Sequence, residues 1–501
     1  MIVELLVVSV IVVAIVVAAF ECWKVYLNNT KLKAFHHEKG LPVFGRALAL
    51  IGKNNEEILQ TFTGDEVTYA WIGPVLIFHV ARPEDFQVIL TSEKCLKKAF
   101  PYQFLYNRTG ILTSEPQIWK EHRRALNPTL GPKMVSSFVP IFNEKSRKMA
   151  DLLERKLNQN VDMQRAMFNS AIETIMSASF GINWQMQNAR GEYIHDLILY
   201  ILEGLQLRIQ RVWLWNPIYK FTAEYKRNIE KFFAFYRFNR GLLETKLMHL
   251  AEKLEHGEDE LAIAKENNNQ NYLQKCLQLQ KEHKWTDENV CEEMDTIFVG
   301  SVDTSATTIC GITLMLAIHP EYQERVVEEM REIFEEQDEP VTNEHLTRMT
   351  FLELVIKESI RHFPIAPYIG RETTGDLEIG GGIIPSGSQV FLNVLRMNKN
   401  PRFYGENAHE FYPERFLPEN CANWHPYLSV PFSAGPRNCI GKRYAWASLK
   451  IALSYILRRF KLTTDLKMQD VIIKPELLLK IGNKNPIRIE RREWRTKPNA
   501  E

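Results

Sequence analysis

The stretch Phe432–Gly441, FSAGPRNCIG, decides how the rest of this 501-residue chain is interpreted. It holds a single cysteine in a glycine-punctuated loop, and the amphipathic run 442–460 that follows predicts a helix. Cys439 then lies just before a helix N-terminus, where free N–H groups and the positive dipole end favour a thiolate over a thiol. Such a thiolate suits a metal ion, and one thiolate on iron is the axial ligand that favours O–O cleavage.

Three neighbours of the cysteine support a binding loop. Gly435 and Gly441 allow tight turns and the close approach of a flat partner, because no Cβ stands in the way. Arg437 can offer positive charge to an acidic group of a ligand. An isolated cysteine is more often a buried structural residue of a turn, so the assignment depends on agreement with the remaining chain.

The pattern F-x-x-G-x-R-x-C-x-G, formed by Phe432, Gly435, Arg437, Cys439 and Gly441, resembles the haem-binding loop of the cytochrome P-450 (haem-thiolate monooxygenase) family. The resemblance implies a mainly helical fold with small β-sheets. It also implies that these five residues bind haem b and that the Cys439 thiolate is its iron ligand. The haem is otherwise expected to be held non-covalently.

The N-terminus is the one compositional anomaly. Residues 1–20 are apolar except for Glu4 and Ser9, and at ~1.5 Å per residue they would span roughly 30 Å, one bilayer core. We expect an uncleaved membrane anchor at 1–23, a linker with a Pro/Gly hinge at 24–45, and a catalytic domain at 46–501. Lysines follow the apolar run, so the bulk of the chain is predicted to face the cytosol. The rival, a cleaved signal peptide, lacks its basic n-region.

Charge and cysteine usage exclude several classes. The net charge of +1 provides no global field for nucleic acid. Seven widely spaced cysteines without a C-x-x-C pair argue against a disulfide framework, a zinc ribbon and a c-type haem. A reducing compartment fits best, and the N-x-T sequons at Asn28 and Asn107 should stay unglycosylated.

A long central helix is predicted from Thr286, an N-cap, to Ile318, before the His319-Pro320 stop. Within it, residues 300–305 (GSVDTS) resemble the family's oxygen-activation motif. Thr304 would hold a relay water and Asp303 would feed protons toward bound dioxygen. The alternative is that both side chains only bend or cap the helix by local bonding.

The motif departs from the family pattern at two positions. Ser301 replaces the usual glycine, which puts the close approach of the helix to the haem in doubt. Gly300 stands where many fatty-acid ω-hydroxylases carry a glutamate that links covalently to haem, so no covalent link is expected. Selectivity for the terminal carbon is therefore also in doubt.

Further motifs follow in family order. Trp119 and Arg123 are four residues apart on one helical face, and Glu358 and Arg361 are three apart and close enough to pair. The resemblance implies that Trp119, Arg123 and Arg371 contact haem propionates. It also implies that Arg415, in the P-E-R-F element, joins Glu358 and Arg361 as structural support.

Several strands and loops are predicted from alternation and turn residues. Residues 67–72 and 75–80 should form a hairpin. Strands 377–384 and 389–395 should flank the turn 385–387. A C-terminal hairpin is expected from 471–481 and 487–489 around Gly482-Asn483. Residues 252–284 are expected to be an exposed connection or short solvated helices.

Taken together, the chain is identified as an insect-like member of the fatty-acid-hydroxylase branch. This implies a lipophilic substrate, whether fatty acid, hormone or xenobiotic, and electrons from an NADPH-cytochrome P-450 reductase in the endoplasmic reticulum membrane. It also admits cytochrome b5 as a further partner. The basic residues Lys120, Arg124, Lys442 and Arg443 are candidates for docking the reductase. Two rivals remain: a reductase-independent haem-thiolate isomerase or dehydratase, and a catalytically silent haem- or lipid-binding protein.

Overall fold

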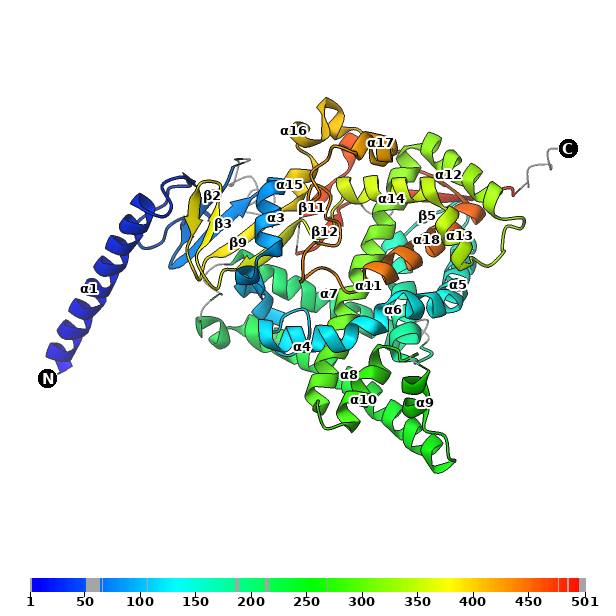
Figure 1. Cartoon of the computed structure of the whole chain (residues 1–501), viewed down its shortest axis with the longest axis horizontal. Helices are drawn as coiled ribbons and strands as arrows, with labels where there is room; N and C mark the ends of the chain where they lie inside the picture. Colours follow the sequence, from blue (N-terminus) through cyan, green and yellow to red (C-terminus); the bar gives the residue numbers. More distant parts are fainter. Residues whose placement is uncertain are drawn as a thin grey trace.

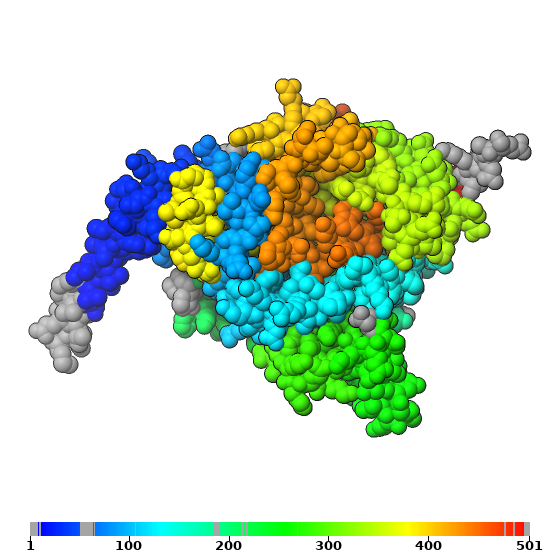
Figure 2. Space-filling model, viewed as in Figure 1, coloured from blue at the N-terminus to red at the C-terminus, as the bar shows by residue number. Residues whose placement is uncertain are grey.

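The structure, a computed structural model, describes residues 2–50, 64, 66–105, 107–184, 189–211, 215, 217–267, 269–475, 477–483 and 486–494. The chain is mainly helical with small β-sheets, which confirms the predicted fold class. One long N-terminal helix, α1 (Ile2–Asn29), projects from the folded body (Figure 1; Figure 2).

The predicted central helix is present as α11 (Asp287–Ile318). Thr286 is its N-cap and forms a capping box with Asn289, while His319 ends it, so both predicted boundaries are confirmed. The helix passes through the middle of the body (Figure 1) and packs against α6 (Met163–Phe180), α14 (Thr350–His362) and α18 (Lys442–Arg459).

Two helices of the described chain are long and apolar enough to cross a membrane. They are α11, in which 72% of the residues are buried inside the protein, and the segment Val12–Asn29 of α1, in which only 11% are buried. Burial therefore identifies α11 as a core helix. The exposed α1 fits a membrane span.

The C-terminal part of α1, which continues to Asn29, packs on the body. Phe20 and Trp23 contact Trp71 with ring centroids 5.9 and 5.6 Å apart. The main-chain N–H of Val43 donates to a carboxylate oxygen of Glu21 at 2.9 Å, which ties the Pro/Gly stretch to the helix.

The largest sheet has six strands in the order β1 (His36–His37), β2 (Thr68–Ile72), β3 (Val75–Val80), β9 (Gln389–Asn393), β6 (Tyr368–Glu372) and β4 (Lys97–Lys98). The β2–β3 hairpin confirms the prediction for 67–80. The predicted strand 389–395 is present as β9, which ends at Asn393 and pairs in parallel with β3 and antiparallel with β6. The segment 377–384, predicted as one strand, is divided in two. Residues 377–384 form their own hairpin, β7 (Leu377–Ile379) and β8 (Gly382–Ile384), because Gly380 and Gly381 adopt the positive φ of its turn.

The predicted C-terminal hairpin is also wrong. β11 (Ile473–Pro475) pairs with β12 (Leu479–Ile481), inside the segment expected to be one strand. β13 (Ile487–Arg491) leaves this hairpin and lies between β10 (Phe460–Thr463) and β5 (Asn160–Val161).

The segment expected to be exposed contains a core helix. α10 (Tyr272–Lys281) buries Tyr272, Leu273 and Cys276 against the body, whereas most of residues 252–258 and much of α9 (Glu260–Glu266) are exposed, as predicted. The prediction missed α10 because the many charged residues of this segment outnumber its regularly spaced apolar residues.

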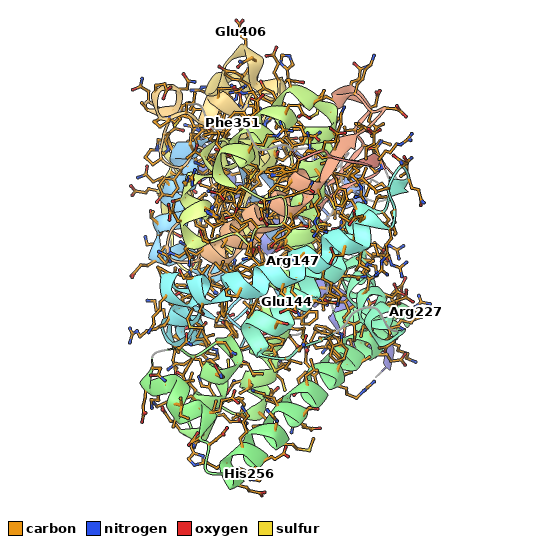
Figure 3. The ribbon with its side chains drawn as sticks, turned by 90° about the vertical axis from the view of Figure 1, so that its right-hand side faces the viewer. Glu144, Arg147, Arg227, His256, Phe351 and Glu406 are labelled. Carbon is orange, nitrogen blue, oxygen red and sulfur yellow. The ribbon has the colours of Figure 1, made fainter. Side chains whose placement is uncertain are left out.

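The remaining helices complete the body, with α5 crossing its centre and α8 running toward His256 in Figure 3. Their bounds are α3 (Pro83–Thr91), α4 (Pro116–Leu126), α5 (Pro132–Glu154), α7 (Ala189–Gln210), α8 (Ala223–Glu255), α12 (Pro320–Ile333), α13 (Asn343–Arg348), α15 (Val394–Asn398), α16 (Pro401–Tyr404) and α17 (Pro418–Cys421).

Candidate cofactor site

The cysteine loop is closed by its own main chain and leads directly into α18. The N–H of Cys439 donates to the carbonyl of Phe432 at 2.9 Å, and Asn438 N–H donates to Gly435 at 3.2 Å. Gly441 is the N-cap residue of α18. The sulfur therefore lies where the sequence placed it, at the entry to a helix.

Gly435 cannot be replaced without moving the backbone. Its φ is +69°, and a Cβ there would stand 1.9 Å from the carbonyl oxygen of Leu90 at the end of α3. This close contact fixes the cysteine loop against α3, which is the physical requirement behind the glycine of the motif.

Two opposing influences act on the Cys439 thiol, whose side chain is exposed at the open side of its loop although the rest of the chain surrounds it closely. Burial raises the pKa of the Cys439 thiol, although the Gly441 N–H and the positive charges of Arg123 and Lys98 oppose the shift. Desolvation and the positive end of the helix therefore act in opposite directions on the thiolate of the haem-free chain. A metal ion would reverse this balance, because a coordinating thiol is deprotonated outright.

Arg123 holds the cysteine loop from α4. Its two terminal nitrogens donate to the carbonyl and the side-chain oxygen of Asn438, both at 2.7 Å, and its Nε donates to Asn127 at 2.7 Å. Lys120 and Arg124, on the neighbouring faces of α4, are exposed.

Arg437 is held by main-chain oxygens. Its guanidinium donates to the carbonyls of Leu96, Ile111 and Ser114 at 2.8, 3.1 and 2.6 Å, and it lies over the buried Trp119 ring at 4.7 Å. The expectation that Arg437 simply offers its charge to a ligand is therefore incomplete, because it also joins the 111–114 segment to the cysteine loop.

Arg371 is 1% exposed, and its guanidinium donates to the carbonyl of Gly370 at 2.9 Å. It pairs across β4–β6 with Lys98, a residue that the sequence analysis missed. Burial and the charges of Arg371 and Arg437 hold the pKa of Lys98 well below its usual range. The strand register that brings Lys98 here is not visible in the sequence.

We call Lys98, Arg123, Arg371 and Arg437 the cation cluster. Among the described residues, no carboxylate oxygen lies within 4 Å of any of the four. Buried cations without acidic partners are costly unless an anion binds them. Together with the cysteine, this donor set fits a metal-centred ligand that carries carboxylates, as haem b does.

The predicted oxygen-activation residues Asp303 and Thr304 lie on two different faces of α11. Asp303 is 1% exposed and accepts from the Thr307 hydroxyl at 3.4 Å, and Thr307 in turn accepts from Gln164 on α6 at 2.9 Å. Thr304 is partly accessible, and its hydroxyl donates to the Gly300 carbonyl at 2.8 Å. The local bonding considered as an alternative is thus present for Thr304.

The two departures from the motif have different surroundings. A Cβ on Gly300 would meet no atom within 4 Å, so this position is open. The hydroxyl of Ser301 donates to the Phe298 carbonyl at 3.3 Å within the helix.

The predicted pairing of Glu358 with Arg361 is present. The two side chains form a double contact at 2.7 and 2.8 Å, and Arg415 approaches Glu358 at 3.6 Å. Burial favours the neutral acid, but the hydrogen bonds from Arg361 and His362 outweigh it and lower the pKa of Glu358 to about 2. Arg361 and Arg415 also donate to carbonyls of the segment 398–410.

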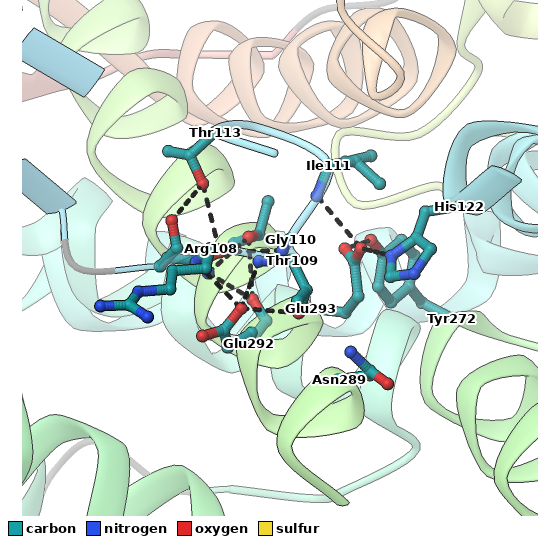
Figure 4. A network of polar contacts seen from close by, with 12 residues as sticks. Arg108, Thr109, Gly110, Ile111, Thr113, His122, Tyr272, Asn289, Glu292 and Glu293 are labelled. Atoms are coloured by element: carbon teal, nitrogen blue, oxygen red, sulfur yellow. Dashed lines mark hydrogen bonds and ion pairs between the residues drawn. The ribbon is translucent and has the colours of Figure 1, made fainter. Parts of the chain in front are cut away.

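Sequence reasoning also missed two adjacent acids of α11, shown in Figure 4. Glu292 accepts from the N–H groups of Arg108 and Thr109 at 3.0 and 2.5 Å. Glu293, fully buried, accepts from Ile111 N–H at 3.0 Å and contacts His122 of α4 at 2.7 Å. The pair therefore fixes the loop 107–111 between α11 and α4.

The same network accounts for the sequon at Asn107. Its side chain is 8% exposed and donates to the Glu292 carbonyl at 2.7 Å and to Thr296 at 3.0 Å. An asparagine in this position has no room for a glycan.

Comparison with known proteins agrees with this geometry. The family model described as "Cytochrome P450" matches residues 36–487. "Cytochrome P450 4V2" of Mus musculus is 31% identical over 483 residues, covering 91% of this chain and 90% of the relative. Two insect proteins are similar: "Cytochrome P450 4c3" of Drosophila melanogaster (30% identical; 88% and 86% covered) and "Cytochrome P450 4c21" of Blattella germanica (31%; 87% and 89%). This chain therefore belongs to the cytochrome P450 family of haem-thiolate monooxygenases, whose members bind haem b through a cysteine thiolate.

Proposed function

We propose that the protein inserts one atom of O2 into a lipophilic substrate, with electrons from NADPH that reach it through a reductase. The observation that carries this proposal is the cysteine loop beside the cation cluster, which has no carboxylate within 4 Å among the residues that the structure describes. A binding site of this composition selects a ligand that combines a thiolate-seeking metal with carboxylates.

Each residue of the site then has a defined task. Cys439 is the iron ligand, and bound haem supplies the oxygen activation that no side chain provides. Arg371, Arg123 and Lys98 are proposed to pair with the two propionates. Arg437 positions the loop through its three carbonyl contacts and its stacking on Trp119.

Proton supply is assigned to α11. Asp303 and Thr307 form a buried polar chain with Gln164, which can store a proton away from bulk water. Thr304 can release its intrahelical bond to Gly300 and hold a water for the last transfer. Asp303 and Thr304 lie on different faces of α11, which agrees with this division into proton storage and water binding.

Exposed residues suggest where the protein meets the membrane and its electron donor. The exposed α1 is proposed to anchor the protein in the endoplasmic reticulum membrane with the catalytic domain in the cytosol. Lys120, Arg124, Lys442 and Arg443 are all exposed beside the cysteine loop and α4, where an acidic reductase face or cytochrome b5 could dock.

A reduced carbon-monoxide difference spectrum of the purified protein tests the proposal. We expect the thiolate-specific absorbance in the wild type and its loss in Cys439→Ser. A protein that carries no porphyrin, or a spectrum unchanged in Cys439→Ser, would overturn the assignment.

Product analysis distinguishes the second candidate, a reductase-independent isomerase. A lipid panel is incubated with and without NADPH and reductase, and a lipid hydroperoxide is added in parallel. Product that requires both NADPH and reductase supports the monooxygenase. Hydroperoxide rearrangement without them supports the isomerase, and no product in any arm supports the silent protein.

A further inference from the structure

The strongest feature that the proposed function does not use is a buried acid–amide contact between α8 and α11. The two helices pack through Phe235 of α8 and Phe298 of α11, whose ring centroids are 5.5 Å apart. One turn before Phe298, Asp295 contacts Asn239 of α8. Helix α8 is the long helix between Arg227 and His256 in Figure 3.

The contact leaves two acceptor atoms buried. Asn239 is 0% exposed and Asp295 is 4% exposed. The Asn239 amide donates to Asp295 Oδ1 at 2.5 Å. Among the described residues, neither Asn239 Oδ1 nor Asp295 Oδ2 has a hydrogen-bond partner. A buried acceptor without a donor costs about 1–3 kcal/mol, so such a pair needs an explanation.

One proton would satisfy both atoms. If Asp295 is a carboxylic acid, its Oδ2–H can donate to Asn239 Oδ1 while the amide continues to donate to Oδ1 of the acid. Both acceptors are then paired and no buried charge remains.

We propose that Asp295 is a neutral, proton-bearing positioning residue that clasps α8 to α11 through a double hydrogen bond with Asn239. Asp295 precedes Asp303 by eight residues, about 12 Å along the helix, so the clasp sets the position of the segment assigned to proton supply. That last step rests on the proposed function, whereas the protonation of Asp295 does not.

The electrostatic surroundings agree with this geometry. Burial raises the pKa of Asp295, the Asn239 hydrogen bond lowers it, and the charge of Glu292 raises it again, with a net value of about 7. The other titratable groups near this contact are Cys291 of α11, whose pKa burial raises to about 11, and Tyr236 and Arg240 of α8. Arg240 is engaged by Asp287 at 2.9 Å and Glu244 at 3.2 Å.

The pH dependence follows with a definite sign. Because the folded pKa lies above the unfolded value of about 3.9, stability from this group is fully present below pH 4. It is lost as the pH rises toward 7 and stays constant above that value. Asp295→Asn keeps two hydrogen bonds, since each amide donates to the other, but it cannot titrate.

The test is the melting temperature of the full-length holoenzyme from pH 5 to 9, for wild type, Asp295→Asn and the control Glu288→Gln, which removes an exposed acid from the same helix. We expect the melting temperature of Asp295→Asn minus that of wild type to increase between pH 5 and 7 and to level off above pH 8. The Glu288→Gln curve should run parallel to wild type. A constant difference for Asp295→Asn would overturn the proposal.

Asn239→Leu keeps the inference testable if Asp295→Asn does not fold. Removal of the amide takes away both hydrogen bonds of the clasp, so the pH at which the stability curve levels off should differ from that of wild type. A curve with the wild-type shape would contradict the clasp. Hydrogen exchange of α8 in the wild type, faster at pH 8 than expected from intrinsic rates, would support it independently of activity, and an unchanged protection factor would not. A failed carbon-monoxide spectrum would reject the proposed function without affecting these results.

Discussion

The protein contains two groups of basic side chains that differ in their partners. Arg361 and Arg415 lie beside the ionised Glu358 and donate to main-chain carbonyls. The cation cluster, Lys98, Arg123, Arg371 and Arg437, has carbonyl and amide partners but no carboxylate within 4 Å among the described residues. The first group has its anion within the chain, whereas we propose that an anionic ligand provides it for the second.

This difference separates structural charges from binding charges. A buried ion pair that loses one partner is strongly destabilised, because the remaining charge stays uncompensated. A buried cation without an acidic partner reduces the stability of the chain and favours ligand binding instead. The same residue type therefore gives opposite responses to substitution in the two groups.

The largest effect is expected from Glu358→Gln. It leaves two buried guanidinium groups without their anion, and we expect a loss of about 3–5 kcal/mol in the free energy of unfolding. Denaturant unfolding followed by circular dichroism measures it. Glu192→Gln, which breaks an exposed ion pair with Arg165, should cost only about 0–1 kcal/mol. Equal costs for the two variants would remove the distinction between the groups.

Arg371→Leu should weaken cofactor binding while sparing the fold. Loss of a charge-assisted hydrogen bond to a propionate is worth about 1.5–3 kcal/mol, or roughly 10- to 100-fold in haem affinity. Haem content per protein and transfer of haem to apomyoglobin measure the loss. Arg361→Leu is the matched variant, for which we expect little folded protein. Retention of haem by Arg371→Leu at wild-type affinity would show that this arginine does not face the propionates.

The pKa of Cys439 gives the next largest effect. Because burial raises it above the ordinary value of a thiol, the thiolate is a minor species at neutral pH in the haem-free protein. Alkylation of Cys439 by iodoacetamide should therefore accelerate about tenfold per pH unit from pH 7 to 9 without reaching a plateau. Peptide mass spectrometry measures it, with Cys421 as the internal reference. A plateau near pH 7 would restore the low pKa first predicted from the helix N-terminus.

The smallest effect is expected from Arg123→Lys. Lysine retains the charge but loses the two-pronged contact with Asn438, so the cysteine loop is less firmly held. We expect a loss of about 1 kcal/mol, which weakens haem retention less than tenfold. Lys120→Arg, on an exposed face of the same helix, is the control. An effect as large as that of Arg371→Leu would contradict this expectation. It would show that haem binding needs the position of the Arg123 guanidinium and not only its positive charge.

Local sequence signals predicted the elements that they control. The Thr286 cap and the His319-Pro320 stop gave both ends of α11, since capping and proline effects act within one turn. The spacing of Glu358 and Arg361 gave their contact for the same reason.

Long-range pairings were not predictable in this way. The strands that β9 and β13 pair with lie far away in the sequence. Turn residues indicate only that the chain reverses or bends locally, so they could not predict these pairings. Lys98, Glu292 and Glu293 were missed because a charged residue in a strand or helix usually faces water. Their burial becomes visible only when the 97–111 segment packs between α4 and α11.

The sequence by itself determined the family, the identity of the thiol and the order of the charged motifs, because these depend on residue type and short spacing. Only the tertiary structure decided which charges are compensated, how burial shifts the pKa of Cys439, and that Asp295 and Asn239 meet. Those properties depend on desolvation and on contacts between distant segments, and neither is encoded in any short stretch of the chain.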